Sequence, residues 1–231
     1  MAKKITLSKN GPYLVSGDIP LDKALIIGGA EGVPAKWEYG EKYPHQISYA
    51  LCRCGLSKNM PFCDGTHTKV PFDGTETANR KPCLAQAETT QGPELDLTDA
   101  EPLCAVARFC HRGGDTWTLT EHSDDPKSKE LAIQEAKDCP SGRLIAWEKR
   151  SGQPIEPTLE QSISVVEDTV QKVSGPLWVK GGIPVESVDG FQYEIRNRVT
   201  LCRCGKSDNK PFCDGNHCQA KFNDGDRSIN Q

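Results

Sequence analysis

The sequence predicts a mainly β fold with short helices, of the α+β class, and three observations lead to this prediction. The 231 residues include 21 glycines and 16 prolines, a composition that favours loops and short strands over long helices. Hydrophobic residues make up only 36% and aromatic residues 6%, which is lean for one large core. A cysteine-rich stretch also occurs twice, so one small structural unit is expected twice.

The duplicated stretch covers residues 51–67 in the first copy and 201–217 in the second. Its two versions read LCRCGLSKNMPFCDGTH and LCRCGKSDNKPFCDGNH. Both fit the pattern C-x-C-x2-S-x3-P-x-C-D-G-x-H, and the second copy begins 150 positions after the first. Each copy supplies three thiolates and one imidazole, and the candidate ligands are Cys52, Cys54, Cys63 and His67, and Cys202, Cys204, Cys213 and His217.

Thiolate and neutral imidazole are ligands that select zinc or iron–sulfur centres over oxygen-preferring cations. Four such ligands either close one tetrahedral zinc site or hold the two irons of a [2Fe–2S] cluster, two ligands to each iron. Structural zinc sites usually present cysteine pairs of the C-x2-4-C type. Here a single residue separates Cys52 from Cys54, which favours the cluster and leaves zinc as the alternative.

Two further residue types in the motif have expected backbone roles. Gly55 and Gly205 follow the second cysteine, where a positive φ allows the chain to fold over the metal. Asp64 and Asp214 are residues typical of a helix N-cap, so the following G-x-H segment is expected to open a helix that carries the histidine.

Arg53 and Arg203 lie between the first two cysteines of each copy. They either offset thiolate charge or meet an anionic partner. The alternative is an ordinary arginine on the solvated surface, and the sequence does not choose between these readings.

The complete pattern resembles the CDGSH iron–sulfur domain family, the mitoNEET-like proteins, with Thr66 and Asn216 where that family has serine or another small residue. The resemblance implies one [2Fe–2S] cluster with Cys3His ligation in each copy, two clusters in all, and a histidine near the surface. It also implies electron transfer, redox sensing or cluster handover rather than turnover of a substrate.

The repeat extends beyond the metal motif. Residues 11–21 match residues 175–185, and each stretch reads as a short β segment bounded by Gly-Pro and Ile-Pro turns. Twenty positions separate Pro20 from Gly40 but only six separate Pro184 from Gly190, so the first copy carries extra residues, including the loop-like IIGGAEGVPAKW. We therefore divide the chain into a first CDGSH unit (1–80), a central segment (81–174) and a second CDGSH unit (175–231).

The resemblance implies a homodimer whose strands form a β-cap beside two clusters. Two copies in one chain predict the same arrangement internally, with a pseudo-twofold axis in place of the true one. The alternative is two separate domains, but each unit alone has few apolar residues for a stable core. We therefore expect a monomer that contains an internal pseudo-dimer.

The central segment carries its own pattern of elements. A helix is predicted over residues 124–138, where an aspartate can cap and Pro126 fits the first turn. Strands are predicted at residues 144–148 and 163–166, and the alternating TWTLT at 116–120 also reads as a strand.

The central segment also contains Cys83, Cys104, Cys110 and Cys139. The last three resemble a divergent single-cluster ferredoxin module of the kind fused to CDGSH domains, and a Cys-Pro end also occurs in bacterial ferredoxins. A fourth ligand is then required from Cys83, His111 or His122. Scattered cysteines are otherwise small buried hydrophobic residues, so a third centre remains an open alternative.

Composition excludes several other functions. The net charge of −4 and the absence of a basic stripe argue against nucleic acid as a partner. We expect no membrane partner either, because the sequence shows no signal peptide and no membrane-spanning run. The odd number of cysteines, eleven, fits a reducing cytoplasm better than a disulfide framework.

No phosphate-binding loop, G-x-S-x-G motif or paired carboxylate site is visible, so we expect no enzyme active site. The leading hypothesis is a protein for electron transfer or redox sensing that uses two [2Fe–2S] clusters and a redox partner. The second is a carrier that gives its clusters to apo-acceptor proteins. The third is a structural zinc protein without a redox role.

Overall fold

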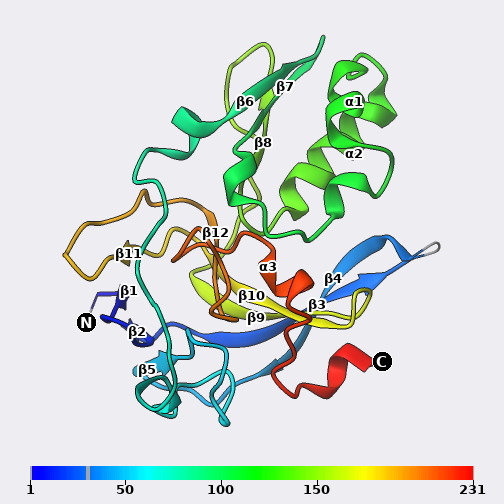
Figure 1. Cartoon of the computed structure of the whole chain (residues 1–231). Helices are drawn as coiled ribbons and strands as arrows, with labels where there is room; N and C mark the ends of the chain where they lie inside the picture. Colours follow the sequence, from blue (N-terminus) through cyan, green and yellow to red (C-terminus); the bar gives the residue numbers. More distant parts are fainter. Residues whose placement is uncertain (1, 30–31, 231) are drawn as a thin grey trace.

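The computed structural model describes residues 2–29 and 32–230 and contains three β-sheets and short helices (Figure 1). The first sheet has the order β11 (Val185–Glu186), β1 (Lys4–Leu7), β2 (Tyr13–Ser16) and β5 (Ser48–Leu51). The second has the order β12 (Arg198–Leu201), β10 (Val173–Lys180), β9 (Ser162–Asp168), β3 (Leu21–Gly28) and β4 (Pro34–Lys42). The third consists of β6 (Glu88–Gln91), β7 (Leu95–Asp99) and β8 (Leu144–Glu148).

The α-helices are α1 (Thr116–Glu121), α2 (Pro126–Asp138) and α3 (Asn216–Gln219), and single 3-10 turns lie between the other elements. They are η2 (Thr66–Thr68), η3 (Cys83–Gln86), η4 (Glu101–Leu103), η5 (Phe109–His111) and η6 (Arg227–Asn230). This mixture confirms the mainly β fold class. In the part of the chain that the structure describes, no helix combines the length and the apolar character needed to cross a bilayer.

The two repeat copies exchange one strand each. In the first sheet, β1 pairs in parallel with β11 of the second copy, with Ile5 opposite Val185. In the second sheet, β9 pairs in parallel with β3 of the first copy, with Ile163 opposite Leu21. Leu21 and Val185 are equivalent positions of the repeat, so the two pairings have the same register. This confirms the predicted pseudo-twofold β-cap within one chain.

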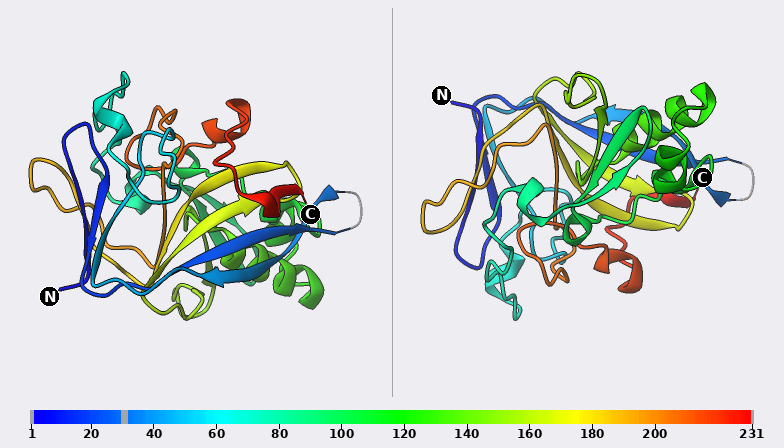
Figure 2. Two further views of the ribbon diagram at one scale, coloured as in Figure 1. Left: turned by 90° about the horizontal axis from the view of Figure 1, so that it is seen from below. Right: turned by 90° about the horizontal axis from the view of Figure 1, so that it is seen from above.

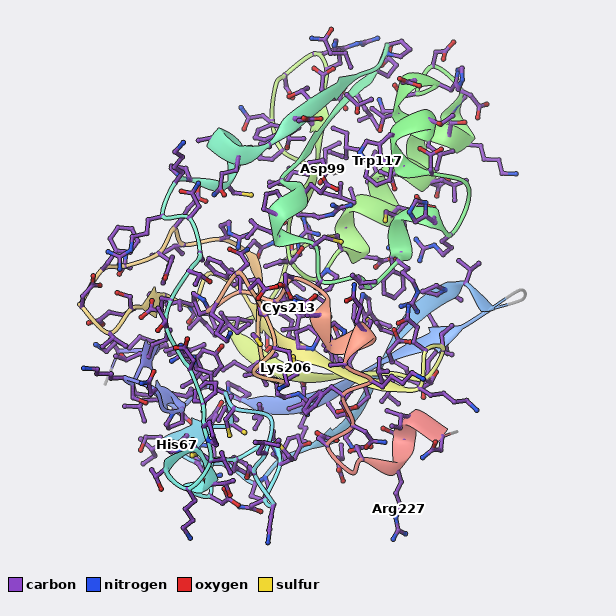
Figure 3. The ribbon with its side chains drawn as sticks, in the orientation of Figure 1. His67, Asp99, Trp117, Lys206, Cys213 and Arg227 are labelled. Atoms are coloured by element: carbon purple, nitrogen blue, oxygen red, sulfur yellow. The ribbon has the colours of Figure 1, made fainter. Side chains whose placement is uncertain are left out.

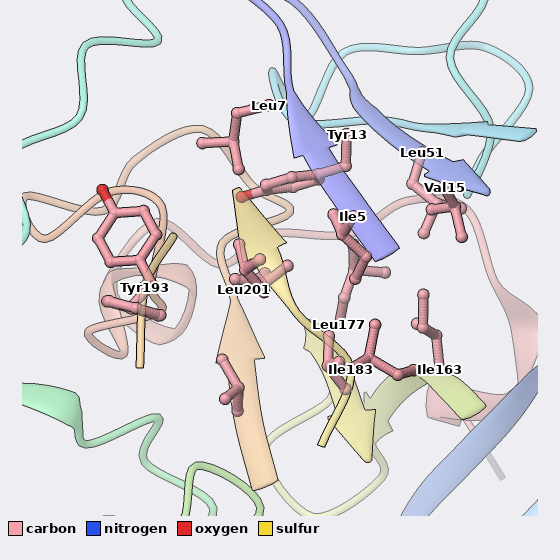
Figure 4. Close-up of a cluster of buried hydrophobic side chains, with 14 of the residues drawn as sticks. Ile5, Leu7, Tyr13, Val15, Leu51, Ile163, Leu177, Ile183, Tyr193 and Leu201 are labelled. Atoms are coloured by element: carbon pink, nitrogen blue, oxygen red, sulfur yellow. The ribbon is translucent and has the colours of Figure 1, made fainter. Parts of the chain in front are cut away.

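The exchange creates a single hydrophobic core from both copies. Figure 4 shows Tyr13 and Leu51 of the first copy packed with Leu177 and Leu201 of the second. All four are at most 1% exposed. Strands with this few apolar residues are not stable as separate hairpins, so each copy depends on the other for its burial.

Residues 26–28 and 34–37 lie in strands, so the loop-like interpretation of residues 26–37 is wrong for them, while residues 30 and 31 lie outside the described residues. These strands, β3 and β4, pair in antiparallel fashion. Trp37 explains the difference. The centroid of its ring lies 4.7 Å from that of Trp178 and 4.9 Å from that of Phe109 in the central segment. Burial of these rings stabilises a sheet extension where glycines alone suggest a loop.

The part of the central segment from β6 to β8 lies on one side of the first two sheets, at the top of Figure 1. The predicted helix is confirmed as α2, with Asp125 capping the backbone N–H of Ser128 at 2.8 Å. The predicted strands at residues 144–148 and 163–166 are confirmed as parts of β8 and β9. β9 lies inside the range 81–174, yet its hydrogen-bonded neighbours are β3 and β10 of the CDGSH copies (Figure 2).

The strand predicted at residues 116–120 is wrong, because these residues form α1. Asp115 accepts a hydrogen bond from the backbone N–H of Thr118 at 2.9 Å and so caps the helix. The hydroxyl of Thr120 donates to the carbonyl of Thr116 one turn earlier. A capping residue after two glycines therefore determines the structure here, and five alternating residues are too few to outweigh it.

Candidate metal centres

Each metal loop begins where a strand of the shared β-cap ends. β5 and β12 finish one residue before the first cysteine of their copies. In the first copy, the backbone N–H of Cys52 donates to the carbonyl of Pro61 (2.8 Å) and that of Cys63 to Ala50 (2.9 Å). The equivalent bonds of the second copy have the same lengths, 2.8 and 2.9 Å. The backbone thus brings the third cysteine back beside the first in both loops.

The predicted ligands lie as two close pairs in each copy. The sulfurs of Cys52 and Cys54 are 3.7 Å apart, as are those of Cys202 and Cys204. The Cys63 sulfur is 3.4 Å from Nδ1 of His67, and the Cys213 sulfur is 3.4 Å from Nδ1 of His217.

These separations suit two ligands on one tetrahedral metal. With metal–sulfur bonds of about 2.3 Å, two such sulfurs lie ~3.8 Å apart. No group of three or more histidine, cysteine, aspartate or glutamate side chains in residues 2–29 and 32–230 has the geometry to hold one ion. The short contacts divide each ligand set into a cysteine pair and a cysteine–histidine pair. Nδ1 is the histidine nitrogen turned toward the third cysteine in both copies, while Nε2 of His217 faces Cys218 at 3.4 Å.

The glycine prediction is confirmed, and these glycines also join the two loops. Gly55 has φ 76° and Gly205 has φ 75°. A Cβ on Gly55 would lie 2.4 Å from the carbonyl oxygen of Cys204, and one on Gly205 would lie 2.6 Å from that of Cys54. The two metal loops thus touch backbone to backbone, at contacts related by the pseudo-twofold axis.

The predicted N-caps at Asp64 and Asp214 are displaced by one residue. The N-cap positions are Gly65 and Gly215, with φ of 82° and 85°. The Asp64 carboxylate instead accepts the backbone N–H groups of Lys58 (2.8 Å) and Thr66 (2.9 Å). It therefore closes the metal loop before the turn that carries the histidine. That turn is the 3-10 turn η2 in the first copy and the short helix α3 in the second.

Both motif arginines are buried, which rules out the surface interpretation. Arg53 is 2% exposed and Arg203 is 1% exposed. Arg53 donates to the carbonyls of Ser8 and Gly74 and lies over the rings of Tyr13 and Phe72. Neither arginine is therefore free to meet an outside partner.

Arg203 differs from Arg53 by having acidic partners. It forms ion pairs with Glu167 (2.7 Å) and with Asp224, and also donates to the Gly175 carbonyl at 3.0 Å. Burial raises the pKa of Glu167 to about 7, against the opposing effect of the Arg203 charge. One guanidinium thus faces two carboxylates beside the second loop, whereas its counterpart beside the first loop is bonded to carbonyls.

The two candidate histidine ligands differ in exposure. His67 is partly exposed, as the resemblance implies, but His217 is only 4% exposed, so the expected surface position is wrong for the second copy. Figure 3 shows His67 at the lower edge of the molecule and Cys213, the neighbour of His217, close to its middle. Burial, assisted by the nearby Arg203, lowers the pKa of His217 to about 4.

Three of the four central cysteines line one cleft. Cys104, Cys110 and Cys139 share it with Ala107 and Arg143. Burial raises the pKa of Cys110 to about 12, and the neighbouring Cys139 adds to the effect. These are thiols that a bound metal converts to thiolates. The three-cysteine cleft is thus a further candidate site for a metal cluster.

Cys83 does not join this cleft. It packs in the core shared by the two CDGSH copies, its backbone N–H donates to Glu194 at 2.6 Å, and its sulfur lies 4.0 Å from Arg196. The two histidines considered as alternatives to Cys83 lie elsewhere. The ring centroid of His111 is 5.8 Å from that of Trp117, and His122 is exposed.

The three-cysteine cleft lies beside the second metal loop. A Cβ on Gly215 would come within 2.2 Å of the Val106 side chain, and the Asn209 amide donates to the Pro102 carbonyl at 2.8 Å. The buried guanidinium of Arg198 on β12 donates to the Cys139 carbonyl at 2.8 Å and to two carbonyls at the end of α2. The central segment is thus held against the second copy.

Sequence reasoning missed two residues that support these loops. Arg198 is an ordinary strand residue in the sequence, so only the fold reveals that it holds the cysteine at the end of α2. The Tyr13 hydroxyl, from the first copy, donates to the carbonyl of Cys202 in the second loop at 2.8 Å. Neither contact has a sequence signal, because each joins segments far apart in the chain.

Comparison with known families agrees with these positions. The sequence model described as "Iron-binding zinc finger CDGSH type" matches residues 10–68 and 174–218. The model described as "Divergent 4Fe-4S mono-cluster" matches residues 90–149, which include the three-cysteine cleft. No curated protein and no solved structure matches the chain.

Proposed function

We propose that this chain, an iron–sulfur protein with two segments of the iron-binding CDGSH family and one of the divergent 4Fe–4S mono-cluster family, is a carrier of single electrons. In this proposal each CDGSH copy holds one [2Fe–2S] cluster, which takes up and releases one electron when bound. The chain acts with a redox partner protein and catalyses no reaction of its own.

The observation that supports this proposal is the division of each ligand set into two pairs. Cys52 and Cys54 would bind one iron, and Cys63 and His67 would bind the other. The second copy repeats the arrangement at the same separations. A single zinc ion requires all four ligands around one point, whereas a binuclear cluster needs two ligands at each end.

The contacts between loops support movement of electrons within the chain. The first and second metal loops touch through Gly55 and Gly205, and the second loop touches the three-cysteine cleft through Gly215 and Val106. The three sites therefore follow one another in the order central cleft, second copy, first copy. The first copy, with its partly exposed His67, is the end at which we place the redox partner.

The exposure of His67 also favours a second function, in which the chain donates the first cluster to an apo-acceptor protein. Mixing the loaded protein with an apo-ferredoxin separates the two functions. Electron transfer leaves the iron with this chain, whereas cluster donation transfers the absorbance and the iron to the acceptor.

The cluster type is tested by metal analysis of protein purified without oxygen. We expect iron, acid-labile sulfide, visible colour that bleaches on reduction, and the electron paramagnetic resonance (EPR) signals of reduced [2Fe–2S] centres. Cys63→Ser and Cys213→Ser are matched variants, and each is expected to remove one of two binuclear centres. Colourless protein that contains zinc and no sulfide would rule out the proposal.

The two copies are also expected to differ in acid stability. Imidazole binds metal only when it is deprotonated, and its ordinary pKa is about 6.5. Because burial lowers the pKa of His217 to about 4, this ligand stays neutral to lower pH, whereas His67 is partly open to solvent. As pH falls, the first centre should bleach before the second.

Stopped-flow absorbance after a jump to acidic pH measures this difference. His67→Cys should slow the fast phase, because the ligand that competes for protons as an imidazole is removed. Equal bleaching rates for both centres, or a fast phase unchanged in His67→Cys, would contradict the assignment.

A further inference from the structure

The three-cysteine cleft lacks one ligand of a four-iron cluster, and the sequence shows where that ligand is missing. Ferredoxin loops commonly read C-x2-C-x2-C, and a cysteine followed by proline completes the ligands. Here the loop reads Cys104-x2-Ala107-x2-Cys110, and the cysteine before proline is Cys139. Ala107 occupies the position of the middle cysteine.

The structure places Ala107 with the three cysteines. Cys104, Ala107, Cys110 and Cys139 all line the same cleft. The loop between the first two cysteines is bent around it, since Val106 and Arg108 have φ of 55° and 64°. Non-glycine residues adopt this conformation at a cost of about 1–2 kcal/mol each, so surrounding contacts must hold it.

Arg108 provides those contacts. Its guanidinium donates to the Val106 carbonyl at 3.0 Å and forms a two-bond ion pair with Asp168 on β9, at 2.8 and 3.2 Å. Asp168 is itself 2% exposed. The loop is therefore fixed around its three cysteines as in a ligand-binding loop, although one ligand position has no donor atom.

Four nearby donors could compete for this place. Cys218 on α3 is close enough to Cys104 for the two thiols to interact, but it does not line the cleft and its sulfur lies 3.4 Å from Nε2 of His217. Cys83 lies in the core of the β-cap, and His111 does not line the cleft. The Ser141 hydroxyl does line it, but it lies 3.5 Å from the Cys139 sulfur, at the same corner, and accepts from the Arg143 backbone N–H at 3.4 Å.

We propose that the central segment holds its cluster through Cys104, Cys110 and Cys139 alone, and that Ala107 leaves the fourth iron without a protein ligand. That iron is bound only by the sulfides of the cluster and exchanges with solvent. Unlike the CDGSH centres, the central site therefore converts between four-iron and three-iron forms.

Mild oxidation tests this directly on the full chain. With one equivalent of ferricyanide, the fourth iron leaves as Fe2+, and the three-iron core that remains gives up one electron to ferricyanide. We expect one iron per chain to be released, with the EPR signal of an oxidised three-iron cluster, and added Fe2+ with a reductant to restore the original spectrum. Complete retention of iron would overturn the proposal.

The variants assign that iron to its site. Ala107→Cys supplies the missing thiolate and should stop the release of iron, whereas Ala107→Val, which adds no donor atom at the same position, should not. Cys83→Ser, His111→Gln, Ser141→Ala and Cys218→Ser should release one iron as the wild type does. If one of these four variants contains less iron than the wild type before oxidation, or releases iron that the wild type retains, that residue is the fourth ligand and the proposal is wrong.

The inference rests on the central segment binding a cluster of its own, and Cys139→Ser separates that premise from the proposal. If Cys139→Ser contains as much iron as the wild type, the segment binds no cluster and the inference falls with its premise. If Cys139→Ser contains less iron but the wild type retains all its iron in ferricyanide, the segment binds a cluster. Only the claim that the fourth iron has no protein ligand is then wrong. The [2Fe–2S] signals of the CDGSH copies are independent of both results.

Discussion

Arg203→Met is expected to lower the free energy of unfolding by about 3–5 kcal/mol, the range for removing one partner of a buried ion pair. The guanidinium is fully buried between Glu167, which is also fully buried, and Asp224, which is 5% exposed. Without the arginine, two carboxylates remain in the interior with no positive charge to offset them. The urea midpoint of tryptophan fluorescence and the iron retained per chain measure the loss.

The repeat supplies a matched control for this change. Arg53→Met removes the equivalent arginine, but its partners are the carbonyls of Ser8 and Gly74, and its Nε has no hydrogen-bond partner in the described residues. Loss of bonds to neutral carbonyls costs about 1–3 kcal/mol. Arg203→Met should therefore be the more damaging of the two.

A further variant isolates the cause. Combining Arg203→Met with Glu167→Gln and Asp224→Asn removes the stranded charges and should recover part of the lost stability. If the triple variant is as unstable as Arg203→Met, or if Arg53→Met is equally damaging, packing rather than charge explains the effect.

The fold was predictable where a local pattern or the repeat carries it. The duplication of residues 11–21 as 175–185 predicts two equivalent units, and the lean composition of each unit predicts that they must share a core. The exchange of β3 and β11 between the units was not predictable. Strand exchange depends on which edges meet in space, and the two-residue strand β11 has no pattern that distinguishes it from a turn.

At the candidate centres, sequence reasoning placed the ligands on their loops but misjudged their surroundings. Arg53 and Arg203 look like surface residues because arginine is mostly exposed in proteins. Their burial follows from contacts with residues 21 to 45 positions away, such as Ser8, Gly74 and Asp224. The burial of His217 has a similar cause, since the central segment packs against the second loop through Val106 and Pro102.

Gly55→Ala is expected to separate the two metal loops, which is the second large effect. A Cβ at Gly55 would lie 2.4 Å from the carbonyl oxygen and 2.7 Å from the carbonyl carbon of Cys204, and neither backbone atom can move as a flexible side chain would. The loop must therefore shift. We expect about 1–2 kcal/mol for alanine at positive φ and a further ~1–3 kcal/mol for the overpacked contact.

Gly65→Ala is the control for the first of these terms. Gly65 belongs to the same loop and has φ 82°, close to the 76° of Gly55, but a Cβ there meets no atom within 4 Å. Its substitution should cost only the backbone term and leave both centres in place. Gly205→Ala, whose Cβ would lie 2.6 Å from the Cys54 carbonyl oxygen, should instead reproduce the larger loss.

Since Gly55 and Gly205 join the loops across the pseudo-twofold axis, Gly55→Ala and Gly205→Ala should also slow electron exchange between the two centres, as measured by flash reduction. Equal unfolding free energies for Gly55→Ala and Gly65→Ala would show that the loops do not depend on this contact.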